Sequence, residues 1–408
     1  MLLSAADRFP KPQFEKPYAP PELYWPNPRL FLSDTFEAIL FTAVLALGAW
    51  LILVVRRRRP VMIYSFACLA WYGFIRRGCI CPVGSIRNAT DAVLFGAASD
   101  WLALFFFCVP LLMALLFGRI FCAGACPLGA LQDLFIVRPL RLPSWLDRLL
   151  RLVPVIVLTS AVICAANGMF SLICRTDPFV GFFRGCGTPI MILTGVFVLL
   201  IGTLTARPYC RYFCPYSVLL SWCTAISWKK PVITPENCIH CNLCAGSCPT
   251  DAIRCPEQAP AFRKLDLFFR SFIRRMITAP LLVLFFAAAG LFWSLPLARH
   301  LPEARLNLAL TNPSPETAAE ADAVIASGRT PSEVGKAAEK ATRRFHLHCI
   351  LGGGFIGLIA AFRLIAAGRK RTRTDYDIDH GLCVACARCY EVCPKNKSIE
   401  KQIVVQDA

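Results

Sequence analysis

The sequence predicts a mainly α-helical integral membrane protein with about seven transmembrane helices and a small α+β domain at one face of the membrane. Two observations lead to this fold class. Of the 408 residues, 56% are hydrophobic and only 17% are charged, and several apolar runs approach the length needed to cross a bilayer. The chain also contains 22 cysteines, most of them in short recurring motifs. This composition excludes an ordinary soluble enzyme and a small disulfide-stapled secreted domain.

The apolar runs define seven expected spans, which differ in how completely they can cross a hydrocarbon core. The run at 61–76 is short and ends at Arg76-Arg77, so it could stop at membrane depth inside protein. The expected spans are residues 33–55, 61–76, 101–118, 152–168, 188–206, 278–297 and 347–367.

Basic residues orient these helices. Arg56–Arg59 follow the first span, so residues 1–32 are expected outside and the next connection inside. Along the whole chain, 27 of the 44 Lys and Arg residues fall on inner segments and 16 on outer ones. Positive-inside loops therefore explain the net charge of +18, and nucleic acid is not expected as a partner.

This orientation divides the chain into five parts. Because the last two spans form a hairpin, the C-terminal tail is expected on the same side as the segment before the hairpin. The outer loop of the hairpin is rich in Ala and Glu and predicts a helix near 316–342. The parts are a Pro-rich outer arm (1–32), a five-helix membrane core with cysteine motifs at both faces (33–206), a cytoplasmic segment (207–277), a transmembrane hairpin (278–367) with its outer loop (298–346), and a cytoplasmic tail (368–408).

One cysteine motif occurs twice on the expected cytoplasmic side. It reads C-x2-C-x2-C-x3-C-P and begins at Cys238 and again at Cys383. In such a motif three closely spaced thiolates hold one iron–sulfur cluster and the fourth cysteine ligates the neighbouring cluster. A zinc site is the alternative, but zinc prefers two separated C-x2-C pairs. The motifs therefore predict a two-cluster ferredoxin-like domain with two [4Fe–4S] clusters, the first on Cys238, Cys241, Cys244 and Cys393, and the second on Cys383, Cys386, Cys389 and Cys248.

Three further cysteine elements share a pattern in which an arginine precedes the cysteines and a proline follows the last one. Two of them read C-x3-C-P and fall at the expected inner face, where the proline places each cysteine group in the turn before a new helix. Their four sulfurs could bind one more iron–sulfur cluster, and the alternative is buried inert thiols or a redox-active dithiol. These cysteines are Cys122, Cys126, Cys210 and Cys214.

The third element falls on the expected outer side. Cys79 and Cys81 lie there together with Cys174 and Cys186, and the four could hold an outer cluster. In an oxidising compartment disulfides compete with this interpretation, and a Cys174–Cys186 bridge is the alternative. The remaining six cysteines behave as small hydrophobic residues and receive no role: Cys68, Cys108, Cys164, Cys223, Cys255 and Cys349.

With these motifs the chain resembles the polyferredoxin membrane proteins typified by NosR, NapH and CcoG. The Gly78-Cys79-Ile80-Cys81-Pro82 and Asp177-Pro178-Phe179 segments look most like a NosR-type core. The resemblance implies electron transfer through the C-x3-C-P and ferredoxin cysteines. NosR-type proteins also carry an outer flavin-binding domain before the first span. This chain departs from that pattern, because only 32 residues precede its first expected span and no flavin-attachment or haem motif is visible. An outer redox protein or flavoprotein is then expected as a separate partner in a multi-subunit complex.

The expected function is electron transfer in the bacterial cytoplasmic (inner) membrane, through [4Fe–4S] clusters, between a cytoplasmic ferredoxin, flavoprotein or quinol and an outer-side partner. An alternative is a redox assembly factor that reduces a metal or thiols during maturation of a metalloenzyme. A scaffold without redox chemistry fits the cysteine motifs less well. Whether the chain is a quinol dehydrogenase or an oxidoreductase subunit stays open. The candidates for a quinol site are His300, His346 and His348, whose alternative role is that of interfacial histidines.

Overall fold

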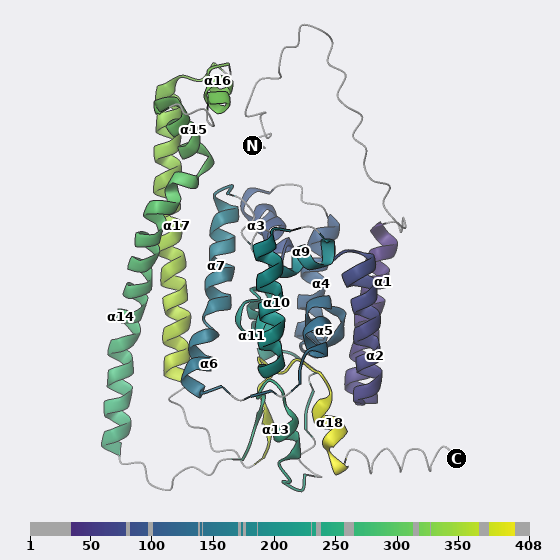
Figure 1. The fold of residues 1–408 in the computed structure, drawn as a ribbon. Coiled ribbons are helices and arrows are strands. Elements are labelled where there is room, and N and C mark those ends of the chain that lie inside the picture. The colour runs from purple at the N-terminus through teal and green to yellow at the C-terminus, as the bar shows by residue number, and fades with distance from the viewer. Residues whose placement is uncertain are drawn as a thin grey trace.

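Long apolar runs of the sequence form helices that stand side by side, and short connections join them (Figure 1). The structure is a computed structural model. It describes residues 34–78, 82–96, 101–137, 139–140, 142–169, 173, 177–185, 187–229, 231–233, 238–256, 265–312, 318–326, 328–366 and 375–395.

The first half of the chain forms a bundle in which α-helices alternate with π-helical turns. Its elements are α1 (Asp34–Trp50), η1 (Leu51–Val55), α2 (Arg58–Cys68), η2 (Leu69–Ile75), α3 (Ser85–Phe95), α4 (Trp101–Phe117), η3 (Phe121–Ala125), α5 (Pro127–Leu134), α6 (Ser144–Leu150), α7 (Val153–Ala166), α9 (Pro178–Arg184), α10 (Pro189–Leu204), α11 (Pro208–Tyr212) and α12 (Tyr216–Ala225).

The second half forms a long helical hairpin between two sets of small elements. In Figure 1 the hairpin helices α14 and α17 stand side by side at one edge of the molecule, and α13 and α18 lie together at one end of the bundle. The elements are α13 (Leu243–Ser247), β1 (Ile253–Arg254), α14 (Leu265–Leu297), η5 (Ala298–His300), α15 (Pro302–Thr311), α16 (Ala318–Ala326), α17 (Pro331–Ala366), β2 (Asp377–Ile378) and α18 (Arg388–Val392).

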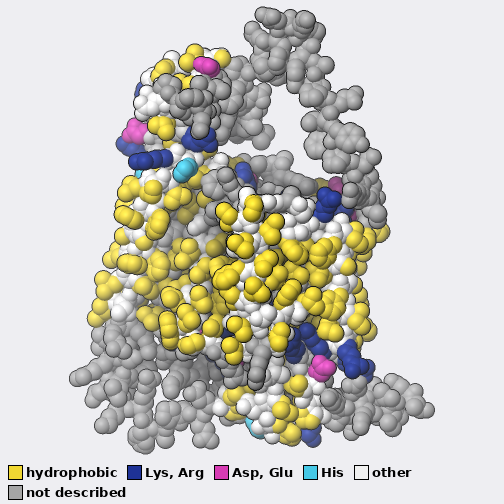
Figure 2. All heavy atoms as spheres, viewed as in Figure 1, with side chains coloured by type: hydrophobic (Ala, Val, Ile, Leu, Met, Phe, Trp, Pro, Cys, Tyr) yellow, Lys and Arg dark blue, Asp and Glu magenta, His cyan; other side chains and the backbone are white. Residues whose placement is uncertain are grey.

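Among the described residues, four helical segments are long and apolar enough to cross a membrane, and they confirm four of the predicted spans. The other three predicted spans are not among these segments. The predicted spans 101–118 and 188–206 correspond to the shorter helices α4 and α10, of 17 and 16 residues, and 61–76 corresponds to α2 followed by the π-helical η2. Figure 2 shows hydrophobic side chains covering a broad belt across the middle of the molecule, as a bilayer requires. The four segments are Asp34–Val55, Trp145–Ala166, Met276–His300 and Pro331–Ala366.

The hairpin helices approach closely because small residues lie between them. A Cβ atom at Gly353 would meet the carbonyl group of Phe286, and one at Gly357 would lie 2.7 Å from the Cα atom of Val283. These two glycines, four residues apart on α17, form the small-residue spacing that lets membrane helices pack backbone to backbone. The hairpin is therefore held by close packing along this stripe.

Replacing Gly353 by valine should destabilise the hairpin by about 1–3 kcal/mol, since the added methyl groups force the two backbones apart. Gly354→Val is the matched control, because a Cβ atom there meets nothing within 4 Å. Thermal unfolding of the purified full chain measures both variants. An equal loss of stability in the two would contradict the packing argument.

The outer loop of the hairpin differs from its prediction. One helix was expected near 316–342, but the structure has α16, a turn at Gly328 with a φ of +71°, and then α17. A capping box sets the start of α17: the Thr330 hydroxyl accepts from the main-chain N–H of Glu333, and the Glu333 carboxylate accepts from the N–H of Thr330. Gly and Pro between the two segments therefore divide the expected helix, and its second part continues without a break into the membrane span.

Candidate iron–sulfur sites

The backbone turns in the same way around the three closely spaced cysteines of both ferredoxin-like motifs. His240 and Asn242 of the first motif have φ angles of 53° and 61°, and Ala385 and Ala387, at the equivalent positions of the second, have 53° and 60°. Left-handed backbone is unfavourable for residues other than glycine. Two copies of one unfavourable turn indicate that both loops are shaped for the same task, which is to direct three sulfurs inward.

The two motifs pack against each other on one side of the molecule, although a membrane hairpin separates them in the sequence. Strands β1 and β2 pair antiparallel with Ile253 opposite Ile378, and these two side chains form a small core with Ala245 and the neighbouring cysteines. The prediction that the hairpin returns the second motif to the side of the first is thereby confirmed.

Each predicted ferredoxin quartet lines a small cavity of its own. Both cavities lie in the module formed by the two motifs, and Cys389 contributes to both. The first cavity is lined by Cys238, Cys241, Cys244 and Cys393 together with Cys389. The second is lined by Cys248, Cys383, Cys386 and Cys389. The structure thus brings the fourth cysteine of each motif to the cavity of the other motif.

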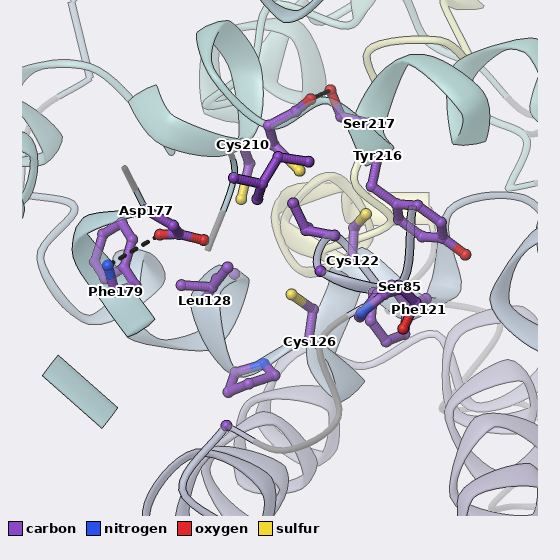
Figure 3. Close-up of a pocket in the computed structure, with 18 of the residues that line it drawn as sticks. Ser85, Phe121, Cys122, Cys126, Leu128, Asp177, Phe179, Cys210, Tyr216 and Ser217 are labelled. Atoms are coloured by element: carbon purple, nitrogen blue, oxygen red, sulfur yellow. Dashed lines mark hydrogen bonds between the residues drawn. The ribbon is translucent and has the colours of Figure 1, made fainter. Parts of the chain in front are cut away.

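The four cysteines predicted at the inner face line one larger cavity, of about 370 Å³, inside the bundle. Figure 3 shows Cys122 of η3, Cys126 at the junction between η3 and α5, and Cys210 of α11 around this space. Cys214 also lines it. Helix α5 begins at Pro127, directly after the first pair, and α12 begins one residue after Pro215, which follows the second pair. The sequence pattern therefore placed the prolines correctly at the starts of new helices.

Within the described residues, no three His, Cys, Asp or Glu side chains are grouped so that they could hold one metal ion. Ligands of a single zinc ion lie about 2.3 Å from it and hence close to one another, whereas each thiolate of a cubane binds a different iron atom. Four thiols around one cavity match the four ligands that a cubane takes.

The inner-face cysteines are partly exposed to the cavity that they line, and the removal of their thiols from bulk water raises the pKa of Cys122, Cys126 and Cys214 and raises that of Cys210 to about 11. Nearby arginines oppose this effect, because their positive charge lowers the pKa of Cys122 and Cys210. Thiolates are the iron-binding form, and a bound metal centre supplies the positive charge that lets buried thiols ionise. The donor set therefore fits an iron–sulfur cluster.

Gln132 of α5 is a polar partner of the inner-face group. Its side chain is fully buried, and its Nε2 donates to Sγ of Cys210 at 3.2 Å and to the carbonyl oxygen of Leu128 at 3.0 Å. Its Oε1 accepts from the main-chain N–H of Tyr209 at 3.1 Å. Donation to a ligand sulfur is one means by which proteins tune a cluster, so Gln132 fixes both the position and the electronic environment of Cys210.

A buried ion pair lies directly beside this group. Arg207, 1% exposed, binds Asp133 through Nε and Nη2 at 2.8 and 2.7 Å, and its Nη1 donates to the carbonyl oxygen of Cys122. Although burial acts to raise the pKa of Asp133, Arg207 and Arg58 hold it below its usual value. Asp133 therefore stays ionised, and the pair ties α5 to the turn before α11.

Arginines after the first span extend this contact to the ferredoxin module. Arg58 lies 3.7 Å from Asp133 and donates through Nη1 to the carbonyl oxygen of Cys386 at 2.8 Å. Arg56 lies over the ring of Tyr390 at 5.6 Å. Sequence reasoning gave these arginines only a role in orientation and missed Gln132 and Asp133. An ionisable residue in the apolar helix after a C-x3-C-P pair was the signal that could have found Asp133.

The three cysteine-lined cavities are neighbours that share lining residues. Cys389 and Tyr390 line both cavities of the ferredoxin module, and Val384 lines the second of these and also the inner-face cavity. One layer of side chains thus separates each cavity from the next. Ala387 and Tyr390 also belong to the main hydrophobic core, so the module is packed against the bundle.

The predicted outer quartet, Cys79, Cys81, Cys174 and Cys186, lies outside the described residues. Its neighbours Gly78, Pro82, Ile173 and Asp177 line the same cavity as the inner-face cysteines. The segments that carry the two predicted membrane-face quartets therefore adjoin one cavity of the bundle.

The predicted quinol-site histidines form contacts between helices. His346 Nδ1 lies 2.6 Å from the Ser294 hydroxyl, and His348 Nδ1 lies 3.0 Å from Nδ2 of Asn167. His300 ends the short η5 helix. These contacts favour the interpretation as interfacial histidines. Of the cysteines without an assigned role, Cys68 and Cys164 are buried among apolar side chains as expected, whereas Cys108 and Cys255 are exposed.

Comparisons with known proteins support the chemistry of these groups. Residues 99–152 and 187–232, which include both C-x3-C-P elements, match a family described as a 4Fe-4S binding domain. Residues 231–254, which include the first ferredoxin-like motif, match a second family with the same description. No solved structure matches the chain significantly.

Curated relatives cover about half of this chain. YccM of Escherichia coli strain K12, named as an electron transport protein, is 32% identical over 192 residues, which cover 41% of this chain and 52% of YccM. The uncharacterized protein MJ0750 of Methanocaldococcus jannaschii is 28% identical over 210 residues, which cover 48% of this chain and 81% of that protein. The regulatory protein NosR of Pseudomonas aeruginosa is 26% identical over 255 residues, which cover 55% of this chain and 35% of NosR.

The apolar helices and the cysteine groups thus define a membrane iron–sulfur protein. More particularly, the chain is similar to the electron transport protein YccM and to NosR, and the predicted resemblance to NosR-type membrane iron–sulfur proteins is confirmed at this level.

Proposed function

We propose that the chain is a membrane-bound electron-transfer protein that passes electrons between the face carrying the ferredoxin module and the opposite face of the membrane. The observation that carries this proposal is the contiguity of the cysteine-lined cavities. Twelve cysteines in three quartets line cavities that share lining residues, from the ferredoxin module into the bundle. The 4Fe-4S family matches and the name of YccM agree with this function.

Bound [4Fe–4S] clusters would supply one-electron chemistry, and the residues of this chain would provide their ligands and environment. Two clusters are proposed in the ferredoxin module, each held by the first three cysteines of one motif and the fourth cysteine of the other. A third is proposed on Cys122, Cys126, Cys210 and Cys214, and a fourth on the outer quartet. A hydrocarbon core of about 30 Å is wide for a single electron-transfer step, so clusters at several depths would divide the crossing into shorter steps.

The chain's own residues set the environment of these sites. Gln132 donates to Cys210, Arg207 holds the loop of Cys122, and Arg58 holds the loop of Cys386. Buried positive charge beside thiolate ligands stabilises the anionic cluster that they would bind. Arg58 also holds the ferredoxin module against the bundle, because it contacts both the loop of Cys386 and Asp133.

We further propose that the ferredoxin module faces the cytoplasm of a bacterial cell, with the N-terminus on the outer side. The bias of basic residues toward inner segments supports this orientation. The donor would be a cytoplasmic ferredoxin, a flavoprotein or quinol, and the acceptor an outer redox protein or flavoprotein. The resemblance to NosR-type proteins supports an outer partner.

Iron and sulfide analysis of the anaerobically purified chain tests the proposal. Three clusters give about 12 irons per chain and four give about 16. Cys122→Ala should remove about four irons and leave the ferredoxin pair, while Cys223→Ala on α12 should remove none. About eight irons in the wild type, with no change in Cys122→Ala, would contradict a cluster inside the bundle.

Sealed vesicles test transfer across the membrane. An impermeant reductant outside should reduce a redox dye enclosed inside only when the chain is present, and Cys122→Ala should abolish this reduction while Cys223→Ala retains it. A wild-type chain with full iron content that fails to reduce the enclosed dye would exclude a conduit across the membrane.

A further inference from the structure

A second large cavity, of about 420 Å³, lies where the bundle, the end of α17 and the ferredoxin module meet. Its lining comes from α6 and α7, from α11 and α12, from Ala366 on α17, and from the stretches near Thr250 and Leu382 of the module. Within the described part of the chain this lining contains one carboxylate, Asp379, and seven arginines: Arg119, Arg148, Arg151, Arg207, Arg211, Arg254 and Arg363.

The carboxylates around this cavity do not balance its arginines. Asp147, behind the lining, pairs with both Arg151 and Arg211, and Asp379 pairs with Arg254. Arg363 donates to the main-chain carbonyl oxygen of Arg151 at 2.8 Å. These four arginines thus share two aspartates, which leaves an excess of two positive charges at this end of the cavity.

Three guanidinium groups also carry unused donors. In the described residues, the buried Nε atoms of Arg119, Arg151 and Arg211 have no hydrogen-bond partner, and the Arg119 side chain is 8% exposed. A buried N–H group without an acceptor costs about 1–3 kcal/mol, and more for a charged group. Positive charge and unsatisfied donors in one enclosed space indicate that an anion with several acceptor oxygens completes the site.

An apolar groove continues from this cavity along the side of α17. The groove and the cavity share Arg254, Arg363 and Asp379. Beyond the shared residues the groove is lined mainly by apolar side chains, with Asp377 and His380 at the side of the ferredoxin module. Among the apolar residues, Trp222 and Phe355 meet edge to face at 6.3 Å. The other large apolar residues of the groove are Leu358, Ile359 and Phe362.

The cavity also lies at the depth expected for the lipid headgroups of a bilayer. Arg151 and Arg363 lie near the ends of two membrane spans, Trp145–Ala166 and Pro331–Ala366, on the side of the ferredoxin module. Trp145 and Leu149 of α6 are exposed beside it, as in a helix that lies in the membrane interface.

We propose that the arginine-lined cavity binds the phosphate headgroup of an anionic phospholipid, whose acyl chains lie along the apolar groove between α12 and α17. Basic pockets between membrane helices at this depth are a general means of lipid recognition. The lipid would join the bundle, the hairpin and the ferredoxin module at the point where all three meet. The cavity borders the inner-face group, since both are lined by Arg119, Cys210, Ser217 and Val384, but the lipid proposal does not rest on the proposed electron transfer.

Native mass spectrometry of the full chain, with phosphatidylglycerol and phosphatidylcholine of equal chain length, tests the proposal. The wild type should retain phosphatidylglycerol in preference to phosphatidylcholine. Arg363→Gln should weaken phosphatidylglycerol binding about tenfold, as the loss of one charge-assisted hydrogen bond implies. Arg343→Gln is the matched control: it makes the same charge change on the same helix, at a side chain that is 80% exposed.

Three results would overturn the proposal. The first is equal retention of the two lipids by the wild type, which needs no variant to fold. The second is equal weakening in Arg363→Gln and Arg343→Gln, which would mean that only net charge matters. The third is complete displacement of phosphatidylglycerol by inorganic phosphate at millimolar concentration, which would assign the site to free phosphate.

Discussion

Arg207→Met is expected to lower the free energy of unfolding by about 3–5 kcal/mol, which is the usual cost of leaving one partner of a buried ion pair uncompensated. The variant leaves Asp133 buried without its bidentate partner and frees the carbonyl oxygen of Cys122. Iron at the inner-face group should fall with stability, since the loop of Cys122 loses its anchor. Thermal unfolding and iron content of the purified chain measure the two effects.

A double variant separates the ion pair from a general loss of packing. Arg207→Met with Asp133→Asn removes both charges and should recover part of the stability lost in the single variant. Arg343→Met, on an exposed side chain, should change stability by less than about 0.5 kcal/mol. If the double variant were no more stable than Arg207→Met, the uncompensated charge of Asp133 would not be the cause.

Cys248→Ala is expected to remove the cluster of the second motif, although Cys248 belongs to the first. The reason is its position: Cys248 lines the cavity of Cys383, Cys386 and Cys389. About four irons should be lost. The electron paramagnetic resonance spectrum of the reduced variant should then match that of Cys383→Ala and differ from that of Cys238→Ala.

Cys255→Ala is the control for this comparison. Cys255 is an exposed cysteine of the same segment whose thiol contacts the side chain of Asn242 at 3.3 Å, and it lines neither ferredoxin cavity. Its loss should leave the iron content unchanged. A Cys248→Ala spectrum equal to that of Cys238→Ala would show that each motif holds its own cluster without exchange.

Local spacing explains what could be predicted from the sequence. The cysteine motifs and their prolines are short-range signals, and they predicted the grouping of Cys238–Cys248 with Cys383–Cys393 and of the two C-x3-C-P elements. Long apolar runs predicted the spans that are confirmed, such as Asp34–Val55. Where an apolar run is shorter, as in α4 and α10, composition alone did not determine where the helix ends.

Contacts between distant segments explain what could not be predicted. Arg58 and Cys386 are 328 positions apart, and nothing in the local sequence of either indicates that one holds the other. The left-handed turns at Ala385 and Ala387 were also missed, because alanine carries no signal for such a backbone. The arginine-lined cavity draws residues from segments throughout the chain, so no motif marks it.

The pairing of β1 with β2 has a consequence for biosynthesis. Ile253 is synthesised before either helix of the hairpin, and its partner Ile378 only after both. The ferredoxin module therefore cannot form while the chain is incomplete, and all four cysteines of the first motif are synthesised before the two membrane helices that separate them from the second motif. Correct insertion of both helices is therefore a precondition for the module: a chain in which only one of the two hairpin helices inserts leaves the two motifs on opposite sides of the membrane.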